Sequence, residues 1–151
     1  MRALVLIDGL HTVELLSALS RLAPLEQAEL LLVCVRGPHS RAGLEMVRGG
    51  PGWRGLPPHL ERAIADAEQA NVADALREAE TLALPIAASV KPITAAGEAG
   101  RVVCQIAAAE EVDLVVVRAG GRDLRGVGPR SLGPAARFIT DHSPCPVLLI
   151  R

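Results

Sequence analysis

Residues 113–151 carry the sequence DLVVVRAGGRDLRGVGPRSLGPAARFITDHSPCPVLLIR. The stretch begins with a continuous apolar run, Leu114 to Val117, passes through a glycine-rich segment and a short helical pattern, and ends in a second apolar run, Pro146 to Ile150. A buried strand that leads through a glycine-rich loop into a helix commonly forms an anion or nucleotide site, because backbone N–H groups and the helix N-terminus both point at the ligand. The stretch therefore predicts an α/β fold with a candidate ligand loop.

The segments upstream alternate in the same way. The apolar pattern predicts strands at 3–7, 30–35 and 86–93, and helices over 13–22, 60–82 and 98–112, with Val13, Leu15, Leu16, Leu19 and Leu22 on the apolar stripe of the first helix. The segment from Gly37 to Pro58 is rich in glycine and proline and is expected to be a long loop. Apolar strands that alternate with helices predict one α/β domain over residues 1–151, built as a single open, five-stranded, mostly parallel sheet with helices on both faces.

Composition limits the function classes. The chain has 151 residues, half of them apolar, and a formal net charge of −1, so no overall charge attracts it to nucleic acid or to an anionic membrane. Its three cysteines are far apart and suggest neither a disulfide framework nor a zinc site, which favours a reducing cytoplasm. Charged residues interrupt the first apolar run, and no run reaches the roughly 18 apolar residues of a membrane span. We therefore expect a cytoplasmic protein without a secretory signal.

Three segments are expected to meet at one edge of the sheet. Asp8-Gly9, Val35 to Gly37, and the loop from Arg118 to Gly133 each follow the carboxyl end of an expected strand. In open parallel sheets, ligands bind outside the carboxyl ends of the strands, at the point where the strand order reverses. These segments are therefore expected to converge on one crevice.

The sequence resembles the universal stress protein family over nearly its whole length. The residues that carry the resemblance are Leu6-Ile7-Asp8-Gly9, the strand ending near Val35, the strand 113–117 with its glycine loop, and the ending His142-Ser143-Pro144-Cys145-Pro146-Val147-Leu148. The resemblance implies the adenine nucleotide alpha hydrolase-like fold. It also implies that Asp8 and the backbone of Val35 would hold the adenine and ribose of a bound nucleotide.

The ATP-binding branch of this family carries G-x2-G-x9-G-[ST] after the fourth strand, and this chain departs from the motif at three points. Gly133 matches the third glycine, but Pro134 stands at the hydroxyl position and supplies neither a hydroxyl nor an N–H, although proline suits the first position of a helix. Arg118 stands at the first glycine, where its side chain would fill ligand space and would be strained at a positive φ. Eleven residues separate Gly121 from Gly133, where the motif has nine.

The positive charge of the same loop favours anion binding in spite of these departures from the motif. Four arginines and one aspartate give the segment a local charge of +3, which would attract an anion through side chains where the backbone cradle is degraded. These residues are Arg118, Arg122, Arg125, Arg130 and Asp123. The alternative is an ordinary solvated loop. Asp8 has two interpretations as well: it contacts a nucleotide, or it accepts hydrogen bonds from backbone donors at the start of the first helix.

The candidate nucleotide-binding residues that follow from the resemblance are Asp8, Val35, Arg118, Gly121, Arg122, Gly133 and Pro134. ATP or AMP is the cofactor that they would hold. Ser131 is a displaced candidate hydroxyl, but the register from the C-terminal ending does not favour it.

Other polar residues give weaker signals. The four histidines His11, His39, His59 and His142 are scattered without metal-ligand spacing, so we interpret them as surface or loop residues and predict no metal site. Cys145 lies between two prolines, and nothing nearby forms an obvious Cys-His arrangement, which indicates a packing role.

The last apolar run also bears on assembly. If Val147, Leu148, Leu149 and Ile150 form an edge strand, their unpaired backbone groups would invite another strand. Members of the resembled family commonly pair this strand across a two-fold axis, so a homodimer is expected. The alternative is an edge that the chain's own loop, 37–58, covers.

Three functions remain open from the sequence. The first is a non-enzymatic, stress-associated regulatory homodimer with a degenerate nucleotide loop, which we prefer. The second is an ATP- or AMP-binding member that uses its loop arginines for phosphate. The third is an enzyme of a related nucleotide-binding class, for which the expected S-G-G-x-D-S-like loop and paired carboxylates are missing from the sequence.

Overall fold

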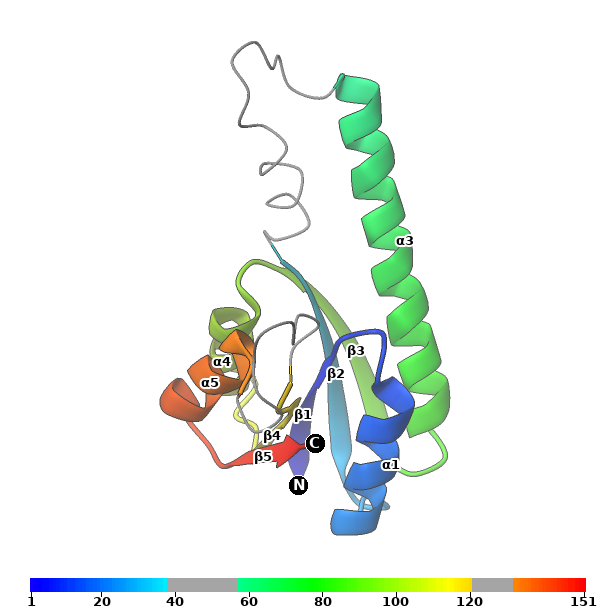
Figure 1. Cartoon of the computed structure of the whole chain (residues 1–151). Coiled ribbons are helices and arrows are strands. Elements are labelled where there is room, and N and C mark those ends of the chain that lie inside the picture. Colours follow the sequence, from blue (N-terminus) through cyan, green and yellow to red (C-terminus); the bar gives the residue numbers. More distant parts are fainter. Residues whose placement is uncertain (38–56, 121–131) are drawn as a thin grey trace.

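The computed structural model describes residues 1–37, 57–120 and 132–151, which form one five-stranded sheet with helices on both faces (Figure 1). The elements are β1 (Arg2–Ile7), α1 (Thr12–Leu22), β2 (Glu29–Arg36), α3 (Pro58–Ala83), β3 (Ser89–Ala96), α4 (Ala99–Ala109), β4 (Leu114–Arg118), α5 (Pro134–His142) and β5 (Val147–Ile150). All four strand pairs are parallel, and the strand order is β3-β2-β1-β4-β5. This confirms the expected fold class.

The strand order reverses between β1 and β4. From β1 the chain builds outward through β2 to β3, and then returns to place β4 on the other side of β1. The carboxyl ends of β1 and β4 therefore form the switch point at which ligands bind in such sheets.

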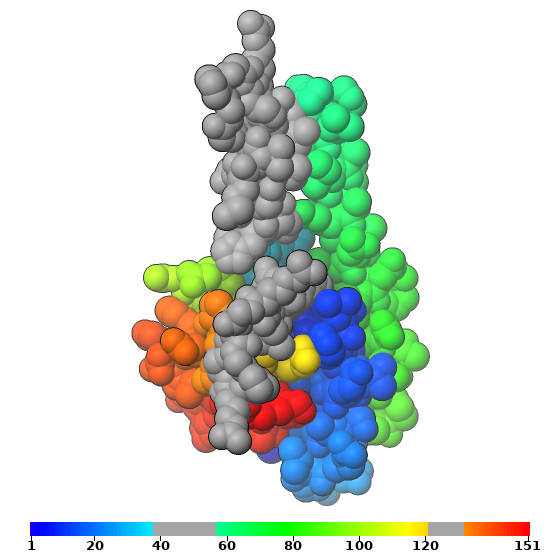
Figure 2. Space-filling model, in the orientation of Figure 1, coloured from blue at the N-terminus to red at the C-terminus, as the bar shows by residue number. Residues whose placement is uncertain are grey.

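Each face of the sheet has its own helix layer. Helices α1 and α3 cover one face, and α4 and α5 cover the other, as the blue and green side and the orange side of Figure 2 illustrate. Central-strand residues such as Val5, Leu32 and Val116 are fully buried, because both faces of these strands are covered. This burial on both faces explains why the sequences of these strands are continuously apolar.

The third strand begins three residues later than expected. We predicted 86–93, but β3 spans Ser89–Ala96, because the N–H groups of Ile86 and Ala87 bond back to the carbonyl of Ala83 in the turn after α3. Both side chains pack against the core from that turn, so their apolar character reflects burial under the helix. Pro92 lies inside β3, which is consistent with a place at the edge of the described sheet.

The apolar stripe of α1 is narrower than predicted. Leu15, Leu16 and Leu19 are at most 3% exposed, whereas Val13 is 53% and Leu22 is 65% exposed. At about 100° per residue, Val13 and Leu22 turn away from the sheet that the other three contact. Their inclusion in the buried stripe was wrong.

Helix α3 begins at Pro58, with Pro57 as its N-cap, and ends at Ala83. Pro58 therefore belongs to the helix, because proline suits a first helical position, and the expected loop cannot include it. The rest of that expected loop, 38–56, lies outside the described residues. No helix in the described ranges combines the length and the apolar character that crossing a membrane requires.

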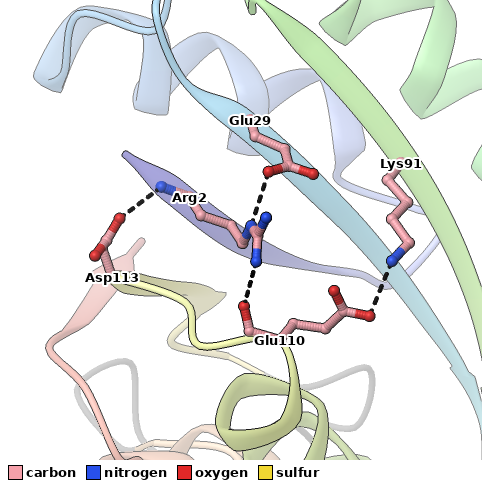
Figure 3. Close-up of polar contacts among 5 residues, drawn as sticks. All are labelled: Arg2, Glu29, Lys91, Glu110 and Asp113. Atoms are coloured by element: carbon pink, nitrogen blue, oxygen red, sulfur yellow. Dashed lines mark hydrogen bonds and ion pairs between the residues drawn. The ribbon is translucent and has the colours of Figure 1, made fainter.

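Polar side chains join the elements at the amino ends of the strands (Figure 3). Arg2 of β1 donates from Nε to Glu29 Oε2 of β2 at 2.7 Å, from Nη1 to the Glu110 carbonyl at 2.6 Å and from its backbone N–H to Asp113 Oδ2 at 2.7 Å. Lys91 of β3 donates to Glu110 Oε1 at 2.9 Å, and this hydrogen bond lowers the pKa of Glu110 below its usual value. The network thus links the first three strands to the turn before β4.

Candidate functional site at the carboxyl edge of the sheet

Asp8 organises the turn from β1 into α1. Its Oδ1 accepts hydrogen bonds from the N–H groups of Leu10 and His11, each at 2.9 Å, and Gly9 between them has φ +75°. Glycine takes this left-handed conformation at little cost. Asp8 therefore has the backbone-satisfying role that we considered for it, and Gly9 is confirmed as a turn residue.

His11 links the two strands of the switch point. Its Nδ1 lies 3.0 Å from Asp8 Oδ2 and 3.0 Å from Arg118 Nη1, so the side chains of Asp8, His11 and Arg118 form one half-buried cluster. His11 lies partly exposed in the β1–α1 turn, as expected of a surface or loop histidine, but its contact with Arg118 was not predicted. The residue is the N-cap of α1, which places its ring against the end of β4.

The turn holds Asp8 in its charged form. Burial alone would raise the pKa of this carboxyl, but the backbone hydrogen bonds from Leu10 and His11 and the contact with the His11 ring together lower it below its usual value. An ionised Asp8 is thus an acceptor for both the backbone and the imidazole.

Arg118 ends β4 and extends its guanidinium toward α1. Among the described residues other than glycine, only Glu111 has a positive φ, at 49°, so the expected strain at Arg118 is absent. The side chain instead lies beside the β1–α1 turn, with Nη1 3.0 Å from His11 Nδ1. In Figure 2 the yellow atoms at this end of β4 reach the surface next to the dark blue N-terminal segment.

The start of α5 offers few donors to an anion. Gly133 is the N-cap, and its N–H bonds to the carbonyl of Ala119 at 2.9 Å. Pro134 is the first helical residue, as predicted, and has no N–H. The two backbone positions that match the end of the nucleotide motif therefore have no N–H group left for a phosphate.

The remaining predicted residues are separate from this cluster or fall in an undescribed part of the chain. Val35 lies near the end of β2, and its side chain packs with the α4 and α5 layer, opposite the face that α1 covers. Gly121, Arg122, Arg125, Arg130 and Ser131 lie outside the described residues. The structure therefore brings together Asp8 and Arg118, and it adds His11 to them.

Two further residues at this edge were not among the candidate binding residues, although Arg36 lies in the segment Val35 to Gly37 that was expected there. Thr12 Oγ1 and Arg36 Nε are buried and lack a hydrogen-bond partner within the described residues. Thr12 begins α1, and Arg36 ends β2. A charged residue directly after a buried strand was the sequence signal for Arg36, whereas an isolated threonine gives none.

The comparisons decide the family. The family model described as "Universal stress protein family" matches residues 1–151. The chain belongs to this family. Its fold is the one that the sequence resemblance implied. A comparison with curated protein sequences finds no match.

Solved structures share the fold of this universal stress protein at low identity. UspA from Lactobacillus plantarum is 23% identical with TM-score 0.70, over 100% of this chain and 97% of that one. A family protein from Arabidopsis thaliana, described with AMP bound, is 18% identical with TM-score 0.63, over 99% of this chain and 90% of the other. The universal stress protein from Archaeoglobus fulgidus in complex with dAMP is 13% identical with TM-score 0.55, over 100% and 98% of the two chains.

Proposed function

We propose that this universal stress protein is a non-enzymatic regulatory protein of the cytoplasm whose nucleotide loop has lost tight binding of ATP. The observation that carries the proposal is the position of Arg118, whose guanidinium contacts the N-cap of α1 through His11 at 3.0 Å. This contact places a side chain at the switch point, beside the carboxylate that would face a nucleotide.

The state of the α5 N-terminus supports the same proposal. The Gly133 N–H is bonded to Ala119, and Pro134 supplies neither N–H nor hydroxyl. Each missing hydrogen bond to a phosphate oxygen costs roughly 1–3 kcal/mol, so two losses weaken binding by about thirtyfold to more than ten-thousandfold. Diffuse positive charge nearby recovers only part of this loss.

A second candidate function is binding of AMP or ATP through arginine side chains. It is favoured by Arg118 and Arg36, which end strands on either side of β1, and by the related structures described with AMP and dAMP. In this case the guanidinium of Arg118 would leave His11 and bind a phosphate.

Calorimetric titration with ATP, ADP and AMP, with and without magnesium, distinguishes the two functions. Mass spectrometry of the purified protein detects any nucleotide that accompanies it. We expect neither a micromolar affinity for ATP nor a stoichiometric nucleotide, and either result contradicts the first function.

Substitutions at the loop refine this test. The double variant Arg118→Gly, Pro134→Ser restores the glycine, the N–H and the hydroxyl, and we expect it to gain ATP affinity by at least about tenfold. The control Arg118→Gly, Pro134→Ala restores the N–H without the hydroxyl and should gain less. Equal ATP affinity in the double variant and the unchanged protein would show that the departures from the motif do not limit binding.

We further propose that the protein is a homodimer paired through β5. Within the part of the chain that the structure describes, β5 lies beside β4 alone, and the side chains of Val147, Leu148 and Leu149 are only partly buried. A second β5 across a two-fold axis would satisfy the open backbone groups and cover these side chains. Light scattering coupled to size-exclusion chromatography measures the mass, and a monomer at tens of micromolar contradicts the proposal.

A further inference from the structure

Two buried polar side-chain atoms in the described chain have no hydrogen-bond partner. The two side-chain atoms of this kind are Thr12 Oγ1 and Arg36 Nε, and both residues lie at the carboxyl edge of the sheet. Buried polar atoms are almost always hydrogen-bonded, so an exception marks a position at which a ligand or water completes the bonding. This edge therefore has unused donors.

Two arginines project from this edge on the side that α1 covers. Side chains alternate along a strand, and Leu30, Leu32 and Cys34 of β2 pack in the α1 and α3 layer, so Arg36 projects there too. By the same alternation Arg118 shares the side of Leu114 and Val116. β1 separates β2 from β4, and the register places Arg36 two residues farther along the sheet than Arg118, so the two arginines start roughly 12 Å apart. Both arginines thus start on the side of the sheet that α1 covers, and the guanidinium of Arg118 contacts His11 at the N-cap of that helix.

One ring nitrogen of His11 contacts both Arg118 and Asp8. The imidazole Nδ1 is 3.0 Å from both Asp8 Oδ2 and Arg118 Nη1. A ring nitrogen either carries a proton and donates, or lacks one and accepts. Without the proton Nδ1 accepts from Arg118, and with the proton it donates to Asp8 and can no longer accept. The two contacts therefore exclude each other as full hydrogen bonds.

We propose that the α1 side of this edge is a proton-gated site for a small doubly charged oxyanion. When His11 takes up a proton, its Nδ1 donates to Asp8 and the guanidinium of Arg118 is released to bind the anion. Arg36 Nε and Thr12 Oγ1, which have no partner in the described chain, are the additional donors.

The charges around His11 favour this gate. With a neutral imidazole, Asp8 and Arg118 give the cluster a formal charge of zero, and protonation of His11 makes it +1. Asp8 faces the ring from the β1–α1 turn, Arg118 faces it from β4, and Glu14 lies in the first turn of α1. The proton and the anion therefore assist each other: an anion that draws Arg118 away leaves Nδ1 of His11 free to take up a proton while Nε2 keeps its own, and the reciprocal coupling has the same size.

Sulfate is the probe, because it is fully ionised across the histidine range. Backbone amide and histidine ring signals are followed by nuclear magnetic resonance during sulfate titration at about pH 5.5 and about pH 7.5, with sodium chloride used to hold ionic strength constant. We expect sulfate to bind at least about fivefold more tightly at the lower pH. Equal sulfate affinity at the two pH values overturns the proposal.

Variants test whether His11 causes the pH dependence of sulfate affinity. In His11→Gln the ratio of the two affinities should fall to about one, whereas His142→Gln, a histidine on α5 that contacts Phe138, should keep the unchanged ratio. Arg118→Gln should lose sulfate binding at both pH values. Amide dispersion verifies that each variant is folded, and a pH ratio that persists in folded His11→Gln overturns the assignment.

Separate experiments test the proton-gated site and the proposed function, so one proposal can be wrong while the other holds. Tight ATP binding at neutral pH would contradict the degenerate loop without changing the expected pH ratio for sulfate. Loss of that ratio would remove the gate without affecting the nucleotide result.

Discussion

Gly100 decides how closely α4 and α5 pack. A Cβ at this position would lie 2.8 Å from Phe138 Cβ, which is fixed to the α5 backbone, and 3.0 Å from the first ring carbons of the same residue. We expect Gly100→Ala to destabilise the protein by about 1–3 kcal/mol, because the overpacking exceeds the roughly 1 kcal/mol that alanine gains in helix propensity. Urea unfolding at neutral pH measures the change.

Gln105 on the same helix provides the control. It is exposed, so Gln105→Ala tests the propensity of α4 without a contact and should change the stability by less than about 0.5 kcal/mol. If Gly100→Ala proves more stable than the unchanged protein, the two helices can separate at no cost and the close contact does not limit their packing.

Single residues of the candidate site were predictable only where the family motif marks them. Asp8 and Arg118 were found because each follows a buried strand at a position that the resemblance assigns. His11 was missed because its partners are three residues away in the turn and 107 residues away on β4. Contacts between distant segments depend on how the strands are ordered, and one sequence does not reveal that order.

At the scale of elements, helix α1 carries leucines in the core and on the surface. Leu19 is fully buried between α1 and the sheet, whereas Leu22, one turn later, is 65% exposed. We expect Leu19→Ala to cost about 2–5 kcal/mol through lost transfer energy and the cavity it leaves. Leu22→Ala should stay within about 0.5 kcal/mol. Thermal and urea unfolding compare the two variants, and similar losses would show that Leu22 is buried in solution, for instance by a partner.

The edge strand β5 permits a second prediction. Val115 N–H bonds to the Pro146 carbonyl and Ala119 N–H bonds to the Ile150 carbonyl, so alternation directs the backbone groups of Val147 and Leu149 away from β4. Leu149→Pro removes an outward N–H while leaving the pairing with β4, and we expect it to convert the proposed dimer to a monomer. Leu149→Ala, which keeps the N–H, should remain dimeric. Light scattering measures both masses, and a dimer of Leu149→Pro would place the interface elsewhere.

The order and type of the elements followed from the sequence, but some of their limits did not. Buried parallel strands leave continuous apolar runs, which is why β1, β2 and β4 were recognisable. Ile86 and Ala87 give the same signal although they pack from a turn, so the start of β3 was placed three residues early. Short apolar runs report burial, and burial does not distinguish a strand from a turn that lies under a helix.

Across the whole molecule, the two ends of the sheet have different polar character. At the amino ends, Arg2 connects Glu29, the Glu110 carbonyl and Asp113, as Figure 3 illustrates. At the carboxyl ends, Asp8, His11 and Arg118 share contacts, and the unpartnered atoms of Thr12 and Arg36 lie at the same edge. The amino end thus joins the strands to one another, while the carboxyl end is where we propose that an anion binds.

Acid should weaken the fold at both ends. The pKa of Asp8 is lowered because the hydrogen bonds from Leu10 and His11 outweigh the effect of burial, and the pKa of Glu110 is lowered chiefly by its hydrogen bond from Lys91. A carboxyl whose pKa is lower in the folded state contributes stability above its unfolded pKa of about 4, and this contribution is lost as pH falls through the folded value. We therefore expect the free energy of unfolding to fall steadily below about pH 4.

The variant Asp8→Asn isolates the contribution of the carboxyl edge to this loss of stability in acid. Asparagine keeps an oxygen for the two backbone N–H groups but not the charge, so we expect the variant to be about 1 kcal/mol less stable than the unchanged protein at neutral pH. The difference should vanish in acid, where Asp8 is itself protonated, so the two stability curves converge as pH falls. Asp66→Asn, at an exposed position of α3, is the control and should follow the unchanged protein throughout. Urea unfolding at a series of pH values measures all three stability curves. If the stability difference between Asp8→Asn and the unchanged protein stays constant into acid, the geometry of the amide causes it and the charge of Asp8 does not stabilise the turn.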